Sequence, residues 1–142
     1  MKKLTSFLFV VLLITGCADN ENQLNSLSED SAKELVENTL ISLENYPRKE
    51  YIDHFNDAVL NAPEFHDLMP QLIQKWNLDN PRNVKVNEVK NGTAEKNNQR
   101  IALVIGTFQC EGVNHVSDFQ FTFVFNETNK KWEIIDFKFE GC

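Results

Sequence analysis

The chain has 142 residues, a formal net charge of −7 and 42% hydrophobic residues, eleven of them phenylalanine. This length suits one compact domain and excludes two, and the apolar content is sufficient to stabilise such a domain. The acidic balance argues against binding to nucleic acid and against electrostatic docking on anionic lipid, because both present negatively charged phosphates.

Residues 1–16 have the three parts of a secretory signal. Lys2 and Lys3 give a positive start, an apolar run covers residues 7–14, and small residues precede Cys17. Eight apolar residues are too few for a transmembrane helix, which needs about 20. We therefore expect residues 1–16 to be a signal peptide that is removed on export.

The residues Ile14-Thr15-Gly16-Cys17 resemble the lipobox of bacterial lipoproteins, in which an aliphatic residue and two small residues precede the cysteine. The resemblance implies that Cys17 receives a diacylglyceryl group. Two or more acyl chains give stable anchoring, so the lipid would hold the mature protein at a membrane of the cell envelope. Ala18, rather than an aspartate, follows this cysteine. In a Gram-negative cell that residue favours the periplasmic face of the outer membrane.

The segment after Cys17 is expected to be a tether. Residues 18–30 are polar and lack apolar periodicity, so residues 17–30 should form the lipidated cysteine and a flexible linker that reaches ~20 Å. Loss of Lys2 and Lys3 leaves 12 basic residues against 21 acidic ones, a formal charge of −9 for the mature chain. Residues 31–142 should then fold as a single domain.

Helices are expected in the first half of this domain. A capping box, with Ser31 at the N-cap and Glu34 three residues later, predicts the start of the first helix. Apolar residues follow at helical spacing as far as Leu43. Pro47 suits the first position of a second helix, whose buried stripe would consist of Tyr51, Ile52, Phe55, Ala58 and Val59.

A third helical segment is expected to begin at Pro63. Because proline lacks a backbone N–H, Pro70 should divide this segment into two short turns. Its apolar side would carry Phe65, Leu68, Met69, Leu72, Ile73 and Trp76.

After the third helix the apolar period changes from about 3.6 to about 2, which predicts strands. Four strands joined by turn-like segments are expected, at 84–90, 100–111, 116–126 and 131–140. In the last hairpin, pairing Phe123 with Ile135 puts the phenylalanines of both strands on the face that meets the helices, and it sets Thr122 opposite Asp136. The sequence therefore predicts an α+β fold, with the N-terminal helices packed on a curved antiparallel meander.

Three parts of the domain carry a resemblance to a known superfamily: the first helix at 36–43, the aromatic residues Tyr51 and Phe55, and the closing strand at 131–137. Together they resemble the cystatin-like cone of the nuclear transport factor two superfamily, and in particular small bacterial lipoproteins of that shape. The resemblance covers residues 31–142. It implies a sheet that curves around a pocket.

Cys110 and Cys142 are the cysteines that remain after lipidation. An even pair in an oxidising compartment predicts a disulfide bond. Both residues should lie at the same end of the meander, but two strand spacings, about 9.6 Å, exceed the roughly 7 Å limit on the Cα separation. The C-terminal tail must therefore bend to form the bond.

Candidate catalytic residues are few. His54 and His66 each stand beside an aspartate, and enzymes of the resembled shape carry a His–Asp or carboxylate base, for which Asp136 is a further candidate. Adjacent residues of a helix do not face each other, however, and His115 lies in a predicted turn. The spacing of these residues predicts no catalytic set, no metal site and no cofactor.

The aromatic residues Trp76, Phe108 and Trp132 are candidates for lining a ligand pocket, although such residues in small domains usually form the core. Our first hypothesis is a non-enzymatic envelope lipoprotein that binds a protein partner or a small apolar ligand. The alternatives are a small isomerase-like or hydrolase-like pocket enzyme, and an immunity or inhibitor protein that neutralises a basic toxin. An ionisable side chain pointing into an open cavity would favour the enzyme.

Overall fold

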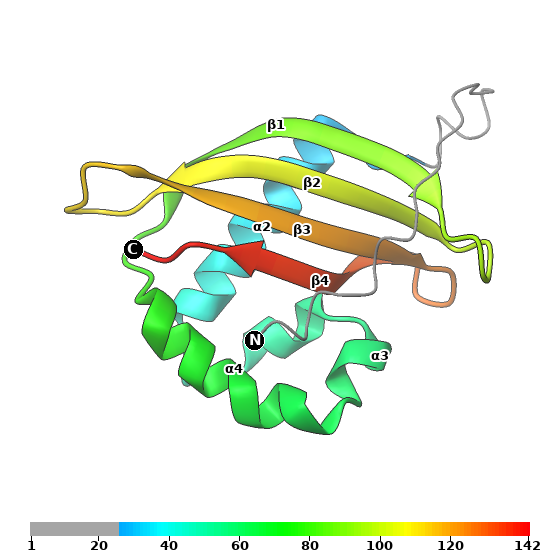
Figure 1. The fold of residues 1–142 in the computed structure, drawn as a ribbon, viewed down its shortest axis with the longest axis horizontal. Coiled ribbons are helices and arrows are strands. Elements are labelled where there is room, and N and C mark those ends of the chain that lie inside the picture. The colour runs from blue at the N-terminus through cyan, green and yellow to red at the C-terminus, as the bar shows by residue number, and fades with distance from the viewer. Residues whose placement is uncertain (1–25) are drawn as a thin grey trace.

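The computed structural model describes residues 26–142 as helices packed against a four-stranded antiparallel sheet, which confirms the predicted α+β class. The predictions for the signal peptide, for Cys17 and for most of the tether lie outside the described residues. In Figure 1, α2 lies behind the sheet, and α3 and α4 lie along its β4 side. The elements are α2 (Glu29–Glu44), the 3-10 helix η2 (Glu50–His54), α3 (Asp57–Leu60), α4 (Pro63–Trp76), β1 (Arg82–Thr93), β2 (Arg100–Gln109), β3 (Val116–Asn126) and β4 (Lys131–Phe139).

Helix α2 begins at Glu29, earlier than the predicted capping box of Ser31 and Glu34. The N-cap is Ser28, whose hydroxyl accepts a hydrogen bond from the backbone N–H of Ser31 at 3.1 Å. Leu27, which we assigned to the tether, is buried with 3% of its surface exposed. Residues 27–30 therefore belong to the folded domain. The buried side of α2 consists of Ala32, Val36, Thr39, Leu40, Ser42 and Leu43.

The predicted second helix is instead two short helices, η2 and α3. The chain becomes extended at Phe55, which forms a parallel bridge with Ile134 of β4. The backbone N–H of Asn56 donates to the carbonyl of Ile134 at 2.9 Å, and the Asn56 side chain accepts from the N–H of Ala58 at 3.0 Å. Pairing with the edge of β4 replaces the helical hydrogen bonds here, so the helix stops and α3 starts from a new cap.

Helix α4 is continuous from Pro63 to Trp76, so the predicted break at Pro70 is wrong. Pro70 cannot donate a hydrogen bond to the carbonyl of His66, yet the helix continues on both sides of it. The predicted apolar side is largely confirmed, because Phe65, Met69, Leu72, Ile73 and Trp76 are buried and Leu68 is half-buried.

The four strands pair in the order β1-β2-β3-β4, the predicted meander. Thr122 pairs with Asp136 as predicted, but Phe123 pairs with Ile134 and not with Ile135. A bulge causes this difference, since Ile135 is an extra residue in β4. Ile134 is consequently turned into the core with no exposed surface.

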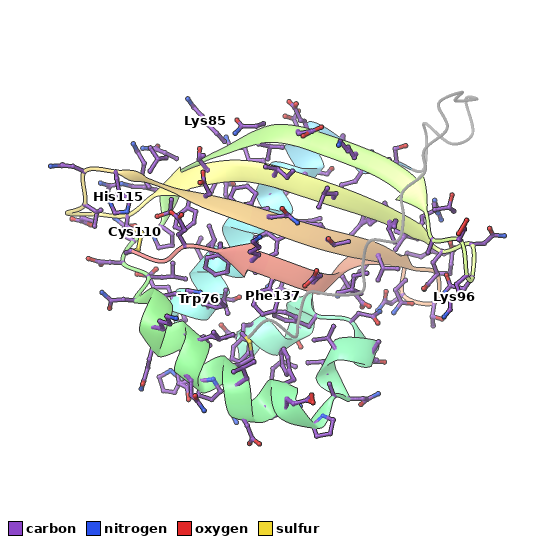
Figure 2. The ribbon with its side chains drawn as sticks, in the orientation of Figure 1. Trp76, Lys85, Lys96, Cys110, His115 and Phe137 are labelled. Carbon is purple, nitrogen blue, oxygen red and sulfur yellow. A yellow bond between two sulfur atoms is a disulfide. The ribbon has the colours of Figure 1, made fainter. Side chains whose placement is uncertain are left out.

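The core lies between the helices and the inner face of the sheet, and aromatic rings dominate it. The ring of Phe137 lies 5.7 Å from Phe55 and 5.7 Å from Trp76, measured between centroids in near-perpendicular contacts. Figure 2 shows Trp76 and Phe137 in the layer between α4 and β4. The inner face of β3 adds Phe119, Phe121 and Phe123, all at most 2% exposed. These aromatic side chains therefore make up the centre of the core.

Candidate functional site

A cavity of about 840 Å³ lies at the end of the sheet that carries the β1–β2 turn. Its lining comes from that turn, from α3 and the first half of α4, and from the strands β2, β3 and β4. In Figure 1, α3 and the β1–β2 turn lie at the same end of the molecule. The volume is in the range of sites for small ligands. The apolar part of the lining includes Val59, Leu68, Met69, Ile101, Val124 and Ile135.

The floor of the cavity is the outer face of the sheet, away from the core. Ile101 of β2 pairs with Val124 of β3, while the next residues along each strand, Ala102 and Phe123, are core residues. Because successive strand residues point to opposite faces, Ile101 and Val124 point away from α2. The bulge brings Ile135 of β4 to the same site.

The rim of the cavity is polar. The β1–β2 turn is closed by hydrogen bonds of 2.8 Å from the N–H of Ala94 to the carbonyl of Gln99, and from Asn98 back to Ala94. Lys96 lies near the tip of this turn (Figure 2). The ionisable lining residues are Glu64, Glu95 and Lys96, and all three are exposed. The site thus offers an apolar floor and a charged opening.

The buried carboxylate of Glu133 accepts a hydrogen bond from Asn56, which lines the cavity. Glu133 is 7% exposed and accepts hydrogen bonds from the side-chain amides of three asparagines. Burial alone would raise the pKa of Glu133, but the bonds from Asn129, Asn126 and Asn56, helped by Lys131, lower it. Glu133 is therefore held ionised and serves as a structural link between β4, the β3–β4 turn and the start of α3, which makes it a poor general base.

Asp136 has a different environment. It is 9% exposed, and the hydrogen bond that it accepts comes from the backbone N–H of its neighbour Phe137, at 2.9 Å. Burial raises the pKa of Asp136 to about 6, against smaller lowering effects of that N–H and of Lys138. Asp136 pairs with Thr122 beside the floor of the cavity.

The three predicted pocket residues lie elsewhere. Trp76 and Phe108 are core residues, at 7% and 0% exposure, and both pack on Phe139. Trp132 is partly buried against Phe125, with 5.2 Å between the ring centroids. None of the three belongs to the lining of the described cavity. The cavity takes its apolar lining from the helical segment, which includes the aromatic Phe65, and from the aliphatic residues Ile101, Val124 and Ile135 of the sheet.

The histidines do not come together at the cavity. His54 ends η2 and is half-buried; burial lowers its pKa, which Asp53 raises and Lys131 lowers further. His66 is exposed on α4, where its Nε2 lies 2.9 Å from the carbonyl of Leu60. His115 lies at the opposite end of the sheet from Lys96 (Figure 2). Residues 26–142 contain no group of three His, Cys, Asp or Glu residues that could hold a metal ion.

Cys110 and Cys142 form the predicted disulfide bond, with a Cα separation of 5.9 Å. The C-terminal tail bends as required: the N–H of Cys142 donates to the carbonyl of Trp76 at 2.7 Å, and the hydroxyl of Ser117 donates to the carbonyl of Gly141 at 2.9 Å. Cys110 lies at the end of the sheet away from Lys96 (Figure 2). The bond therefore joins the C-terminal tail to the residue that follows β2, at the end of the sheet remote from the cavity.

The floor residues escaped the sequence analysis, although one signal could have revealed them. The stretch 101–105 of β2 is apolar at every position, so both faces of this strand carry aliphatic side chains. A strand with one face in water normally alternates between apolar and polar residues. Ile101, Leu103 and Ile105 are thus an apolar row on the outer face, and the cavity lies at the Ile101 end of it.

Among the described residues, no helix is long and apolar enough to span a bilayer. Comparisons with protein-family models, with curated proteins and with solved structures give no match for this chain.

Proposed function

We propose that this protein is a lipid-anchored binding protein of the bacterial envelope and that its domain takes up a small apolar ligand. The observation that carries the proposal is the cavity of about 840 Å³, whose floor is made of aliphatic side chains from three strands. Such a floor gains free energy by burying apolar ligand surface, at roughly 25 cal/mol for each Å². The polar rim is suited to orienting a ligand.

The position of the ionisable residues supports binding over catalysis. The lining carries Glu64, Glu95 and Lys96 at its exposed rim, whereas His54 and His66 are not part of the lining. Asp136 stands one row beyond the lining residue Val124, and no lysine, arginine or histidine of residues 26–142 lies within ion-pair distance of it to form an acid–base pair. A general acid or base must come within hydrogen-bond distance of the reacting proton. The pocket-enzyme alternative therefore has less support than the binding protein.

The lipid anchor on Cys17 is supported by the lipobox-like residues, and the fold adds a spatial argument. Leu27 is hydrogen-bonded to Asn91, near the end of β1, and the turn that follows β1 forms part of the cavity rim. The nine residues 18–26 span at most ~30 Å when extended. The cavity would thus lie close to the membrane surface, where apolar ligands are concentrated.

We also infer that the domain is a cystatin-like cone. The long helix α2 behind an antiparallel meander supports this arrangement (Figure 1). In a cone of this kind the bulge at Ile135 would increase the local twist of β4 beside the cavity.

The binding proposal can be tested by native mass spectrometry on the Cys17→Ala chain, purified after export. We expect an apolar small molecule to co-purify with this protein. Ala58→Trp should abolish its occupancy, because Ala58 lies in the cavity lining on an exposed part of α3 and the indole would enter the cavity.

Asn61→Trp is the matched control for this substitution, since Asn61 is also exposed, follows α3 and lies outside the lining. It should retain the bound molecule. Equal occupancy in the Ala58→Trp and Asn61→Trp proteins, or an empty cavity in the parent chain, would contradict the proposal. Membrane fractionation of the lipidated chain against Cys17→Ala tests the anchor separately.

A further inference from the structure

We propose that Asp136 is the polar anchor of the cavity and that the ligand is an apolar molecule with a protonated amine. This inference rests on the proposed function and adds to it the chemical class of the ligand. Its basis is the position of a buried carboxyl group that receives little compensation from the protein, beside an apolar floor.

The pairing of the strands places Asp136 on the cavity side of the sheet. Val124 lines the cavity, and Thr122, two residues away on β3, points to the same face. Asp136 pairs with Thr122 across the β3–β4 ladder, so its side chain shares this face. The two-residue step from Thr122 to Val124 corresponds to roughly 7 Å along the strand. A ligand that lies on the floor and extends along the sheet would reach Asp136 next.

The carboxyl group is desolvated without an adequate partner. Asp136 is 9% exposed, and its Oδ1 accepts one hydrogen bond, from the N–H of Phe137. Within residues 26–142, no lysine, arginine or histidine comes within ion-pair distance of it. A buried carboxylate gains stability when a cation is placed next to it. A ligand ammonium group would supply the missing positive charge.

The charges around Asp136 also favour a cation over an anion. On the same face, Lys138 pairs with Gln120 in the row next to Asp136, where its charge lowers the pKa of Asp136, and the ionised Glu133 pairs with Val124 in the row on the other side. Lys90, at the far end of the Asp136 row, is paired with Glu88 at 3.4 Å. The rim adds Glu64 and Glu95 against Lys96. The ionised Asp136 would itself repel a fatty-acid carboxylate, whereas it would attract an ammonium group.

The test uses three probes with the same alkyl chain, namely dodecylammonium, dodecanol and dodecanoate, titrated calorimetrically below their micelle-forming concentrations into Cys17→Ala protein at about pH 8. We expect dodecylammonium to bind about tenfold more tightly than dodecanol, and dodecanoate to bind most weakly. The preference for the amine should disappear as the pH falls through about 6, because Asp136 then takes up a proton. The alkylammonium stays charged over this range, as a lysine does.

Asp136→Asn should remove the preference for the amine at pH 8, so that dodecylammonium and dodecanol bind this variant about equally well. The matched control is Asp118→Asn, an exposed carboxylate on β3 that should leave all three affinities unchanged. If the amine and the alcohol bind equally well to the parent protein, or if the preference survives in Asp136→Asn, the anchor proposal is overturned while the binding function stands. If none of the three probes binds, the binding function fails as well.

Discussion

Two hydrogen bonds join Leu27 and Asn91, although the two residues are 64 positions apart in the sequence. The backbone N–H of Leu27 donates to Oδ1 of Asn91 at 2.8 Å, and Nδ2 of Asn91 donates to the carbonyl of Leu27 at 3.1 Å. The asparagine amide thus bonds to the backbone of Leu27 as the backbone of a neighbouring strand would. It links the residues before α2 to the end of β1. This contact fixes the point at which the chain enters the domain.

We predict that Asn91→Ala lowers the free energy of unfolding by about 1–2 kcal/mol, because both backbone groups of the buried Leu27 lose their partner. Urea denaturation followed by circular dichroism measures this loss. Asn87→Ala, an exposed asparagine on the same strand, should stay within about 0.5 kcal/mol of the parent. Equal losses in the two variants would show that the Leu27 contact contributes nothing.

The sequence predicts the strands well because burial of one face imposes an alternation that is visible residue by residue. It predicts the β3–β4 register correctly as far as the pair of Thr122 and Asp136. Beyond this pair, Ile134 and Ile135 are chemically identical, so the pattern does not reveal which of them enters the core. In the structure it is Ile134 that enters the core, and its backbone forms the bridge with Phe55.

The cavity was harder to predict because it depends on how α3 and α4 sit against the sheet. A proline in a helix normally predicts a break, yet α4 runs unbroken from Pro63 to Trp76, and Leu68 and Met69 of its first half line the cavity. The disulfide, in contrast, was predicted from the cysteines alone: if Cys17 carries lipid, as we propose, Cys110 and Cys142 are the pair that remains, and the structure bonds them.

We predict that Cys142→Ser lowers the free energy of unfolding by about 3–4 kcal/mol, because the bond to Cys110 closes a loop with a sequence separation of 32. Urea titrations with and without reductant measure the loss. Reductant should bring the parent protein to the level of the variant and leave the variant unchanged. A parent protein that keeps its full stability under reductant, with free thiols confirmed by labelling, would contradict this prediction.

Glu133→Gln should destabilise the protein at neutral pH by about 1–3 kcal/mol, because a second amide would face the donor of Asn129 in place of an acceptor. The folded-state pKa of Glu133 lies below its ordinary value of 4.5, so its contribution is present above that pH and is lost as the pH falls. The difference between parent and variant should therefore shrink towards pH 3. A difference that is the same at pH 7 and pH 3 would exclude ionisation as its cause.

Asp136→Asn should have the opposite sign and raise the free energy of unfolding by about 1–3 kcal/mol at pH 8. The folded-state pKa of Asp136 is raised from 3.8 to about 6, so the folded protein binds the proton more tightly than the unfolded chain does. The ionised carboxylate is therefore a cost to stability above about pH 6, and the gain from its removal should vanish near pH 4. Chemical denaturation at the two pH values measures this change.

The destabilising carboxylate of Asp136 also bears on the binding proposal. A binding site often contains a group that lowers the stability of the ligand-free protein, because the group is suited to the ligand and not to the fold. A cationic ligand would supply the positive charge that Asp136 lacks. A stabilised Asp136→Asn protein that also loses its preference for an amine would join the two observations, whereas a destabilised one would show that the carboxylate is a structural group.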